Sequence, residues 1–166
     1  QGVVPNSLTR YYVDVDATSG NNTGLSWENA FTDLQSALAS PCPDITEIWV
    51  AEGTYKPSAY PAGCTDCATN RDFTFQLKDG VSLYGGFAGM ETMLNERDIA
   101  MNPTILSGDL GGMTVNAYHV VLAAFDIITP TTWLDGFIIT GGNADVSSNI
   151  TVNGEAIYRS IGGGIY

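Results

Sequence analysis

A short motif, Leu-x-Gly, recurs three times within runs of β-forming residues and limits the folds open to this chain. It occurs at Leu83–Gly85, Leu106–Gly108 and Leu134–Gly136, with the glycines 23 and 28 residues apart. Each copy joins an apolar residue that can pack inward to a glycine that lets the chain turn. Repeats of about 20–30 residues with one strand each predict a solenoid whose coils differ in loop length. Chance recurrence is the alternative, because the chain contains 19 glycines.

Composition narrows the possible partners. The 166 residues, 44% of them hydrophobic, are enough for one domain or part of one. The chain has 18 acidic and 6 basic residues, a formal net charge of −12, which argues against binding nucleic acid or anionic membranes. Solubility or the binding of cations would each account for the acidity. No run of about 18 apolar residues is present, so the sequence predicts no membrane insertion.

A single amphipathic helix is predicted near the N-terminus. Ser26 is a suitable N-cap, and Pro41 follows the last apolar position. Between them one apolar stripe has helical spacing, formed by Trp27, Ala30, Phe31, Leu34, Ala37 and Leu38. We expect a helix over residues 27–39 that covers the open end of the first coil, rather than a face that binds a partner.

A turn-rich segment follows the first predicted strand and carries oxygen ligands. Asp14, Asp16, Asn21 and Asn22 lie close together in the sequence, as a calcium site requires. The spacing differs from that of an EF-hand, and the alternative is that these side chains cap Asx-turns. The sequence therefore gives a candidate calcium site, with calcium as the one cofactor considered.

The cysteines are odd in number. The chain contains three cysteines, Cys42, Cys64 and Cys67. If two of them form a disulfide, the third is free or paired with another molecule. A zinc site would have to recruit Cys42 and the single histidine, His119, which lies in an apolar run and is expected to be structural. At least one disulfide is expected in an exported chain, but the pairing is left open by the sequence.

Export is expected for two reasons. Low charge and abundant Gly, Asn, Thr and Tyr are typical of extracellular β-rich proteins. Gln1 in place of a methionine is explained by removal of a signal peptide, or equally by trimming of the chain. We therefore expect the protein to be extracellular or at the cell surface.

The order of motifs along the chain resembles a known family. The motifs that carry this likeness are Tyr11-Tyr-Val-Asp, Ile48-Trp-Val-Ala-Glu-Gly-Thr-Tyr, Val81-Ser-Leu-Tyr-Gly-Gly-Phe-Ala-Gly, Thr104-Ile-Leu-Ser-Gly-Asp, Leu134-Asp-Gly-Phe-Ile-Ile-Thr-Gly-Gly and Gly162-Gly-Gly-Ile-Tyr. Together they resemble the N-terminal part of bacterial secreted right-handed parallel β-helix proteins with polymorphic-outer-membrane-protein-like repeats. The loop at residues 56–71, with its cysteines, departs from that pattern.

This resemblance implies a mainly β fold in two parts. Residues 1–44 would supply a strand, a loop and the capping helix, and residues 45–166 the first coils of a parallel β-helix that continues beyond the chain. Strands near 48–51, 81–84, 105–107 and 134–140 are expected to stack in parallel, with the leucines of the three Leu-x-Gly copies in one internal ladder. The open end would be covered by further coils or by another surface protein.

The function expected is structural or adhesive, because no catalytic residues are assigned. The alternatives are a carbohydrate-active enzyme, a polysaccharide lyase or glycosidase, and a carbohydrate-binding module on the same fold. An enzyme would need two nearby carboxylates, for which Asp109 and Asp135 are the candidates. A sugar-binding module would use exposed aromatic residues such as Tyr55, Tyr60 and Tyr84.

Overall fold

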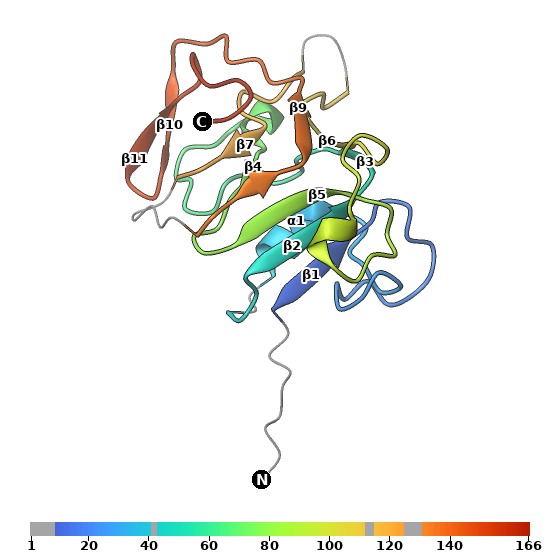
Figure 1. The fold of residues 1–166 in the computed structure, drawn as a ribbon. Helices are drawn as coiled ribbons and strands as arrows, with labels where there is room; N and C mark the ends of the chain where they lie inside the picture. Colours follow the sequence, from blue (N-terminus) through green and yellow to red (C-terminus); the bar gives the residue numbers. More distant parts are fainter. Residues whose placement is uncertain (1–8, 41–42, 112–114, 125–130) are drawn as a thin grey trace.

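The fold is built mainly of three short parallel sheets, each of which pairs strands from successive parts of the chain (Figure 1). A computed structural model describes residues 9–40, 43–111, 115–124 and 131–166. The first sheet contains β1 (Arg10–Val13), β2 (Glu47–Ala51), β5 (Ser82–Phe87) and β8 (Leu134–Asp135). The second contains β3 (Gly53–Tyr55), β6 (Thr104–Ser107) and β9 (Phe137–Thr140), and the third β4 (Phe75–Gln76) and β7 (Val121–Leu122).

The chain visits the three sheets in a fixed order, which makes the arrangement β-solenoid-like. One coil runs through β2, β3 and β4, the next through β5, β6 and β7, and the last begins with β8 and β9. Residues 163–166 then run beside β7, with a parallel bridge between Val121 and Ile165. Every pairing within the three sheets is parallel, so the prediction of stacked parallel strands is confirmed.

Three short elements and one hairpin lie outside this order. Helix α1 (Leu34–Ala39) precedes β2, and two single 3₁₀ turns, η1 (Asn70–Asp72) and η2 (Leu94–Glu96), lie in the long connections. The antiparallel pair β10 (Asn149–Val152) and β11 (Glu155–Tyr158) projects from the last coil. The sequence analysis predicted neither the hairpin nor its place beside the connection that leads to η1.

The core is built from apolar side chains that repeat at equivalent positions in successive coils. In the first sheet Ile48, Leu83 and Leu134 are register partners. In the second sheet Tyr55, Leu106 and Ile139 occupy equivalent positions. These side chains belong to one cluster inside the stack, which is the burial that parallel sheets covered on both faces require.

The predicted single ladder of three leucines is wrong. Leu83 and Leu134 share the first sheet, but Leu106 lies in the second sheet. The motif recurs because it marks two different corners of the coil. The coil of β5 and β6 therefore contains two copies of the motif, and a full turn is longer than the spacing of the motif suggests.

Glycine is needed at these corners because successive coils touch through their backbones. A Cβ added to Gly85 would lie 2.6 Å from the carbonyl oxygen of Gly136. A Cβ added to Gly136 would lie 2.6 Å from the carbonyl oxygen of Gly85. The same contact recurs at the other corner, where a Cβ on Gly108 would lie 2.6 Å from the Gly141 oxygen. A side chain at any of these positions would force the coils apart.

The predicted helix over residues 27–39 is wrong in length, because α1 begins only at Leu34. Phe31 forms a parallel bridge with Val13, and its N–H donates to the Tyr12 carbonyl at 2.9 Å. That pairing keeps the first half of the apolar stripe extended. The N-cap is Asp33, whose carboxylate accepts the Ser36 N–H at 2.7 Å. A six-residue helix remains where a long capping helix was expected.

The two ends of the stack differ. The outer edge of β1 is paired with residues 24–31: the Tyr12 N–H donates to the Gly24 oxygen at 2.9 Å, and the Asp14 N–H to the Phe31 oxygen at 2.8 Å. β8 and β9 end their sheets, and no other described segment hydrogen-bonds the backbone of Phe137–Ile139. Only the first edge is closed within the described residues.

Aromatic side chains cover the outer face of the first sheet. Trp49 stacks on Phe87 with ring centroids 4.5 Å apart, and Trp27 and Tyr12 pack around them. The Arg10 guanidinium lies 3.5 Å above the Trp49 ring. Trp49 and Phe87 are consequently as buried as the interior of the coils.

Candidate functional site

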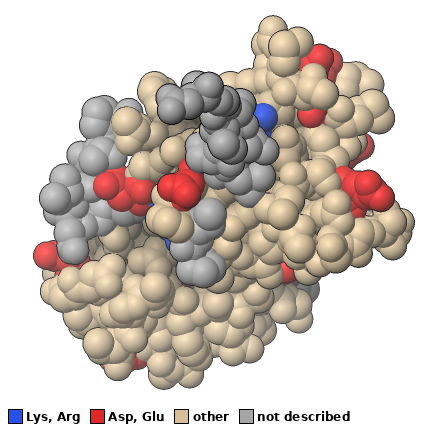
Figure 2. Space-filling model, turned by 90° about the horizontal axis from the view of Figure 1, so that it is seen from below, with Lys and Arg blue, Asp and Glu red and all other residues tan. Residues whose placement is uncertain are grey.

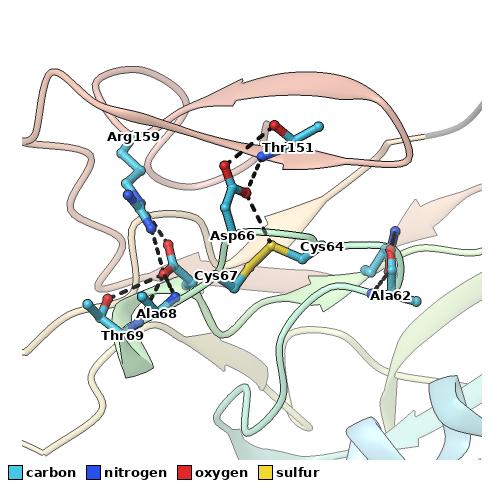
Figure 3. The surroundings of a disulfide bond; sticks show 10 residues. Ala62, Cys64, Asp66, Cys67, Ala68, Thr69, Thr151 and Arg159 are labelled. Atoms are coloured by element: carbon cyan, nitrogen blue, oxygen red, sulfur yellow. Dashed lines mark hydrogen bonds and ion pairs between the residues drawn. A yellow bond between two sulfur atoms is a disulfide. The ribbon is translucent and has the colours of Figure 1, made fainter.

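The connection between β3 and β4 carries the disulfide. Cys64 and Cys67 are bonded, as Figure 3 shows, so the prediction of at least one disulfide is confirmed. Cys42 lies outside the described residues. The bond closes a tight loop that projects from the coil formed by β2, β3 and β4 toward the hairpin β10–β11.

This loop pairs with the hairpin almost as a third strand. Cys64 forms an antiparallel bridge with Val152, and the Thr65 N–H donates to the Thr151 oxygen at 3.1 Å. The Asp66 carboxylate accepts the Thr151 N–H at 2.6 Å, which is also visible in Figure 3. The disulfide thereby holds Asp66 where it can fix the hairpin against the coil.

A buried ion pair makes a second connection between the same two segments. Asp72 is 4% exposed, and its two oxygens accept Nε and Nη2 of Arg159, each at 2.7 Å. The carboxylate also accepts the backbone N–H groups of Ala68 and Thr69. Because a bidentate pair with its remaining lone pairs satisfied tolerates burial, Asp72 fixes the position of the hairpin without exposing charge.

An open groove of about 560 Å³ lies where α1, β4, the disulfide-bearing connection and the hairpin meet. Helix α1 contributes Gln35, Leu38 and Ala39 to its lining, and β4 with the residues after it contributes Gln76, Leu77, Lys78 and Asp79. The other described lining residues are Ala59, Tyr60, Ala62, Ala124 and Asn153. The groove is mainly apolar with a few polar side chains, as ligand sites commonly are.

Tyr60 is the aromatic residue in this groove, and the coil holds it in place. Its ring is 42% exposed and packs on Phe73, with centroids 5.0 Å apart. The Gln76 side chain accepts the Ala62 N–H at 2.6 Å and donates to the Ala62 oxygen at 3.4 Å. Segment 58–62 is therefore joined to β4, so the tyrosine is presented on a fixed backbone.

The charged groups among the described residues of the groove are one cation and one anion, Lys78 and Asp79. The Lys78 ammonium donates to the Ser40 carbonyl at 2.8 Å, and partial burial lowers its pKa. The other five basic residues of the chain each pair with a carboxylate, in the pairs Arg10–Glu47, Lys56–Asp109, Arg71–Asp145, Arg97–Asp135 and Arg159–Asp72. Figure 2 shows the result on one face: scattered acidic groups, large uncharged areas and very little basic surface.

The candidate calcium ligands all lie in the described part of the chain, and two of the four side chains, those of Asp14 and Asn22, accept backbone N–H groups of nearby turns. Asp14 Oδ1 accepts the Asp16 N–H at 2.9 Å, and Asn22 Oδ1 accepts the Thr32 N–H at 2.9 Å. The Asn21 N–H donates to the Asn29 side chain at 3.1 Å. No group of three or more His, Cys, Asp or Glu side chains suited to a metal occurs among the described residues. Calcium binding stays a prediction.

The two candidate catalytic carboxylates are on different sheets. Asp135 is in β8 of the first sheet and pairs with Arg97. Asp109 follows β6 of the second sheet, and its carboxylate lies 3.6 Å from the Lys56 ammonium. Asp109 follows one Leu-x-Gly motif and Asp135 lies within another, but the two copies of the motif belong to different sheets, so the residues do not occupy equivalent positions in successive coils.

The three candidate sugar-stacking tyrosines differ in exposure. Tyr55 is buried, where its hydroxyl donates to the Ala51 oxygen and accepts the Val15 N–H; burial raises its pKa. It is not the exposed aromatic that was expected. Tyr84 is half-buried beneath Arg97. Tyr60 alone of the three is both exposed and in the groove.

His119 is buried, in agreement with its expected structural role. Its Nδ1 lies 3.0 Å from the Gly162 carbonyl oxygen, to which the protonated nitrogen donates. The ring packs edge-on against Tyr166. The other nitrogen, Nε2, is buried without a hydrogen-bond partner in the described residues, and burial lowers the pKa of the ring.

Comparison of the chain with known protein families, curated proteins and solved structures gives no match. Among the helices of the described residues, none has the length and apolar character needed to cross a bilayer.

Proposed function

We propose that this chain is the N-terminal segment of a secreted cell-surface protein with a structural or adhesive role, built on a right-handed parallel β-helix of the polymorphic-outer-membrane-protein-like type. The observation that carries the proposal is the difference between the two ends of the stack. One edge is paired with residues 24–31, whereas no described strand pairs with the outer edges of β8 and β9. The right hand follows from the strong chirality of parallel crossover connections.

The exposed end has the surface expected of a place where more coils join. Leu134, Phe137 and Ile139 continue the interior rows but are only partly buried. Trp133, just before β8, is 61% exposed. Free strand edges beside apolar side chains pair readily with other strands. Further coils of the same polypeptide, or another surface protein, would complete the hydrogen bonding and bury these side chains.

Two further features support export. The disulfide is typical of proteins from oxidising compartments. The pairing of basic with acidic side chains leaves a surface with little capacity for nucleic acid.

Immunolabelling tests the location. Antibodies against this chain should label intact cells of the source organism, and the label should disappear after brief protease treatment of those cells. An antibody against a cytoplasmic protein, positive only after permeabilisation, is the control. Labelling that requires permeabilisation would contradict the proposal.

Photo-crosslinking tests the exposed end in the intact, surface-displayed protein. Replacing Trp133 with a photoreactive phenylalanine should give crosslinks to following coils or to a partner, because that position lies beside the free edge. Tyr158 on β11 is 50% exposed and serves as the matched position. Crosslinking no stronger at 133 than at 158 would count against a docking role for this end.

Carbohydrate binding is the second candidate function, and exposed Tyr60 in the groove is the observation that favours it. Catalysis has less support. A glycosidase places two carboxylates on either side of one bond, whereas Asp109 and Asp135 belong to separate sheets and are each paired with a cation. If the protein cleaves a polysaccharide and that activity is lost in Asp109→Asn or Asp135→Asn, catalysis would be favoured over carbohydrate binding.

A further inference from the structure

The groove beside Tyr60 has the features of a saccharide-binding site. A sugar ring presents an apolar face of C–H groups and an edge of hydroxyl groups, so its site needs a flat aromatic surface next to a few polar side chains. Tyr60 provides an exposed ring, and Leu77 and Leu38 add apolar lining. Lys78 and Asn153 line the same groove and carry donors and acceptors suited to hydroxyl groups.

The aromatic surface is fixed before any ligand arrives. Phe73 packs against Tyr60, and the Thr74 N–H donates to the Ala59 oxygen at 3.1 Å. Gln76 joins both backbone polar groups of Ala62 to β4. A side chain held in this way loses little conformational entropy on binding, which is the advantage of a preorganised site.

The charges select a neutral saccharide. Among the described residues that line the groove, the two charged ones, Lys78 and Asp79, have opposite signs, so neither a carboxylated nor an amino sugar is matched by net charge. The chain as a whole has a formal net charge of −12, which repels polyanions such as uronate polymers. The open shape of the groove suits a stretch of an oligosaccharide chain rather than one enclosed sugar.

We propose that the groove between α1, β4 and the disulfide-bearing connection binds neutral oligosaccharides, with one sugar ring stacked on Tyr60. This proposal rests on the second of the two functions proposed above and is independent of the scaffold role. It places carbohydrate binding on a defined face of the coil, on the side where the hairpin and the disulfide loop are joined.

Calorimetric titration of the full 166-residue chain tests the proposal. The probes are cellohexaose, xylohexaose and mannohexaose, with hexagalacturonate as the anionic probe. At least one neutral probe should bind saturably, with little dependence on salt. Tyr60→Ala should weaken that binding about tenfold or more, and Tyr60→Phe should stay within about threefold, because the ring and not the hydroxyl makes the contact.

The matched control is Tyr158→Ala, which removes a comparably exposed tyrosine from β11 outside the groove and should leave affinity unchanged. Thermal melting of each variant shows that the fold is intact. Binding that survives Tyr60→Ala would overturn the site while leaving carbohydrate binding standing. Absence of binding to every neutral probe at about 10 mM, a limit near 3 kcal/mol of binding free energy, would overturn both. Tighter binding of hexagalacturonate would overturn the neutral class.

Discussion

Truncation of Leu106 tests whether the second sheet lies inside a closed coil. The side chain is 0% exposed and lies between its register partners Tyr55 and Ile139. Leu106→Ala removes three carbon atoms, which at about 0.8 kcal/mol for each buried CH₂ gives about 2.4 kcal/mol. The cavity left behind raises the expected loss of unfolding free energy to about 2–5 kcal/mol.

Leu134→Ala is the informative comparison. Leu134 is chemically identical and also faces the interior, but it is only partly buried at the exposed end. Its truncation opens to solvent instead of leaving a closed cavity, so the expected loss is about 1 kcal/mol. Ile138, 51% exposed, is the control, and Ile138→Ala should change stability by no more than about 0.5 kcal/mol.

Urea unfolding, followed by tryptophan fluorescence, measures these differences. The buried Trp49 stack provides the signal, and an unchanged urea dependence between variants confirms that the same transition is compared. A loss of less than about 1 kcal/mol for Leu106→Ala, or a loss no larger than that of Leu134→Ala, would refute the reasoning.

Three further outcomes are expected. Cys64→Ser should lower the unfolding free energy by about 2 kcal/mol, because the disulfide closes only a short loop and removes little entropy from the unfolded chain. Alkylation of the native wild-type chain should leave Cys64 and Cys67 unmodified. Three reactive thiols would contradict the disulfide. The lowered pKa of His119 means that the unfolded chain binds the proton more readily, so stability should fall as pH drops below about 6.5. His119→Phe should flatten that dependence in urea titrations across the pH range, and an unchanged slope would show that another group titrates. If Asp14 and Asp16 hold calcium, the ion should raise the melting temperature and a chelator should reverse the rise, whereas superimposable melting curves would exclude binding.

The strands could be predicted from the sequence because their pattern is local. Runs such as Glu47–Ala51 and Thr104–Ser107 combine β-branched or aromatic residues with an adjacent turn, and both are strands. The sheet to which a strand belongs is not a local property, because the length of each connection decides which earlier strand it pairs with. The repeated motif therefore predicts one ladder for the three leucines, whereas the structure places them in two sheets.

The extent of the helix and the ion pair that holds the hairpin could not be predicted, for a related reason. The apolar spacing from Trp27 onward satisfies a helix, yet pairing of Phe31 with β1 satisfies the same side chains in an extended chain. Likewise nothing near Asp72 in the sequence indicates its partner Arg159, 87 residues away. The signal that was present is composition: Tyr60 lies in a proline-rich connection too long for a simple turn.

The order of pairing has a consequence for how the molecule is made. In all three parallel sheets each strand pairs with one that precedes it in the chain: β2 with β1, β5 with β2, and β8 with β5. A polypeptide that emerges N-terminus first thus always finds its template already assembled. Residues 24–31 close the first edge before that template is needed, so growth of the stack has a single direction, set by synthesis and export.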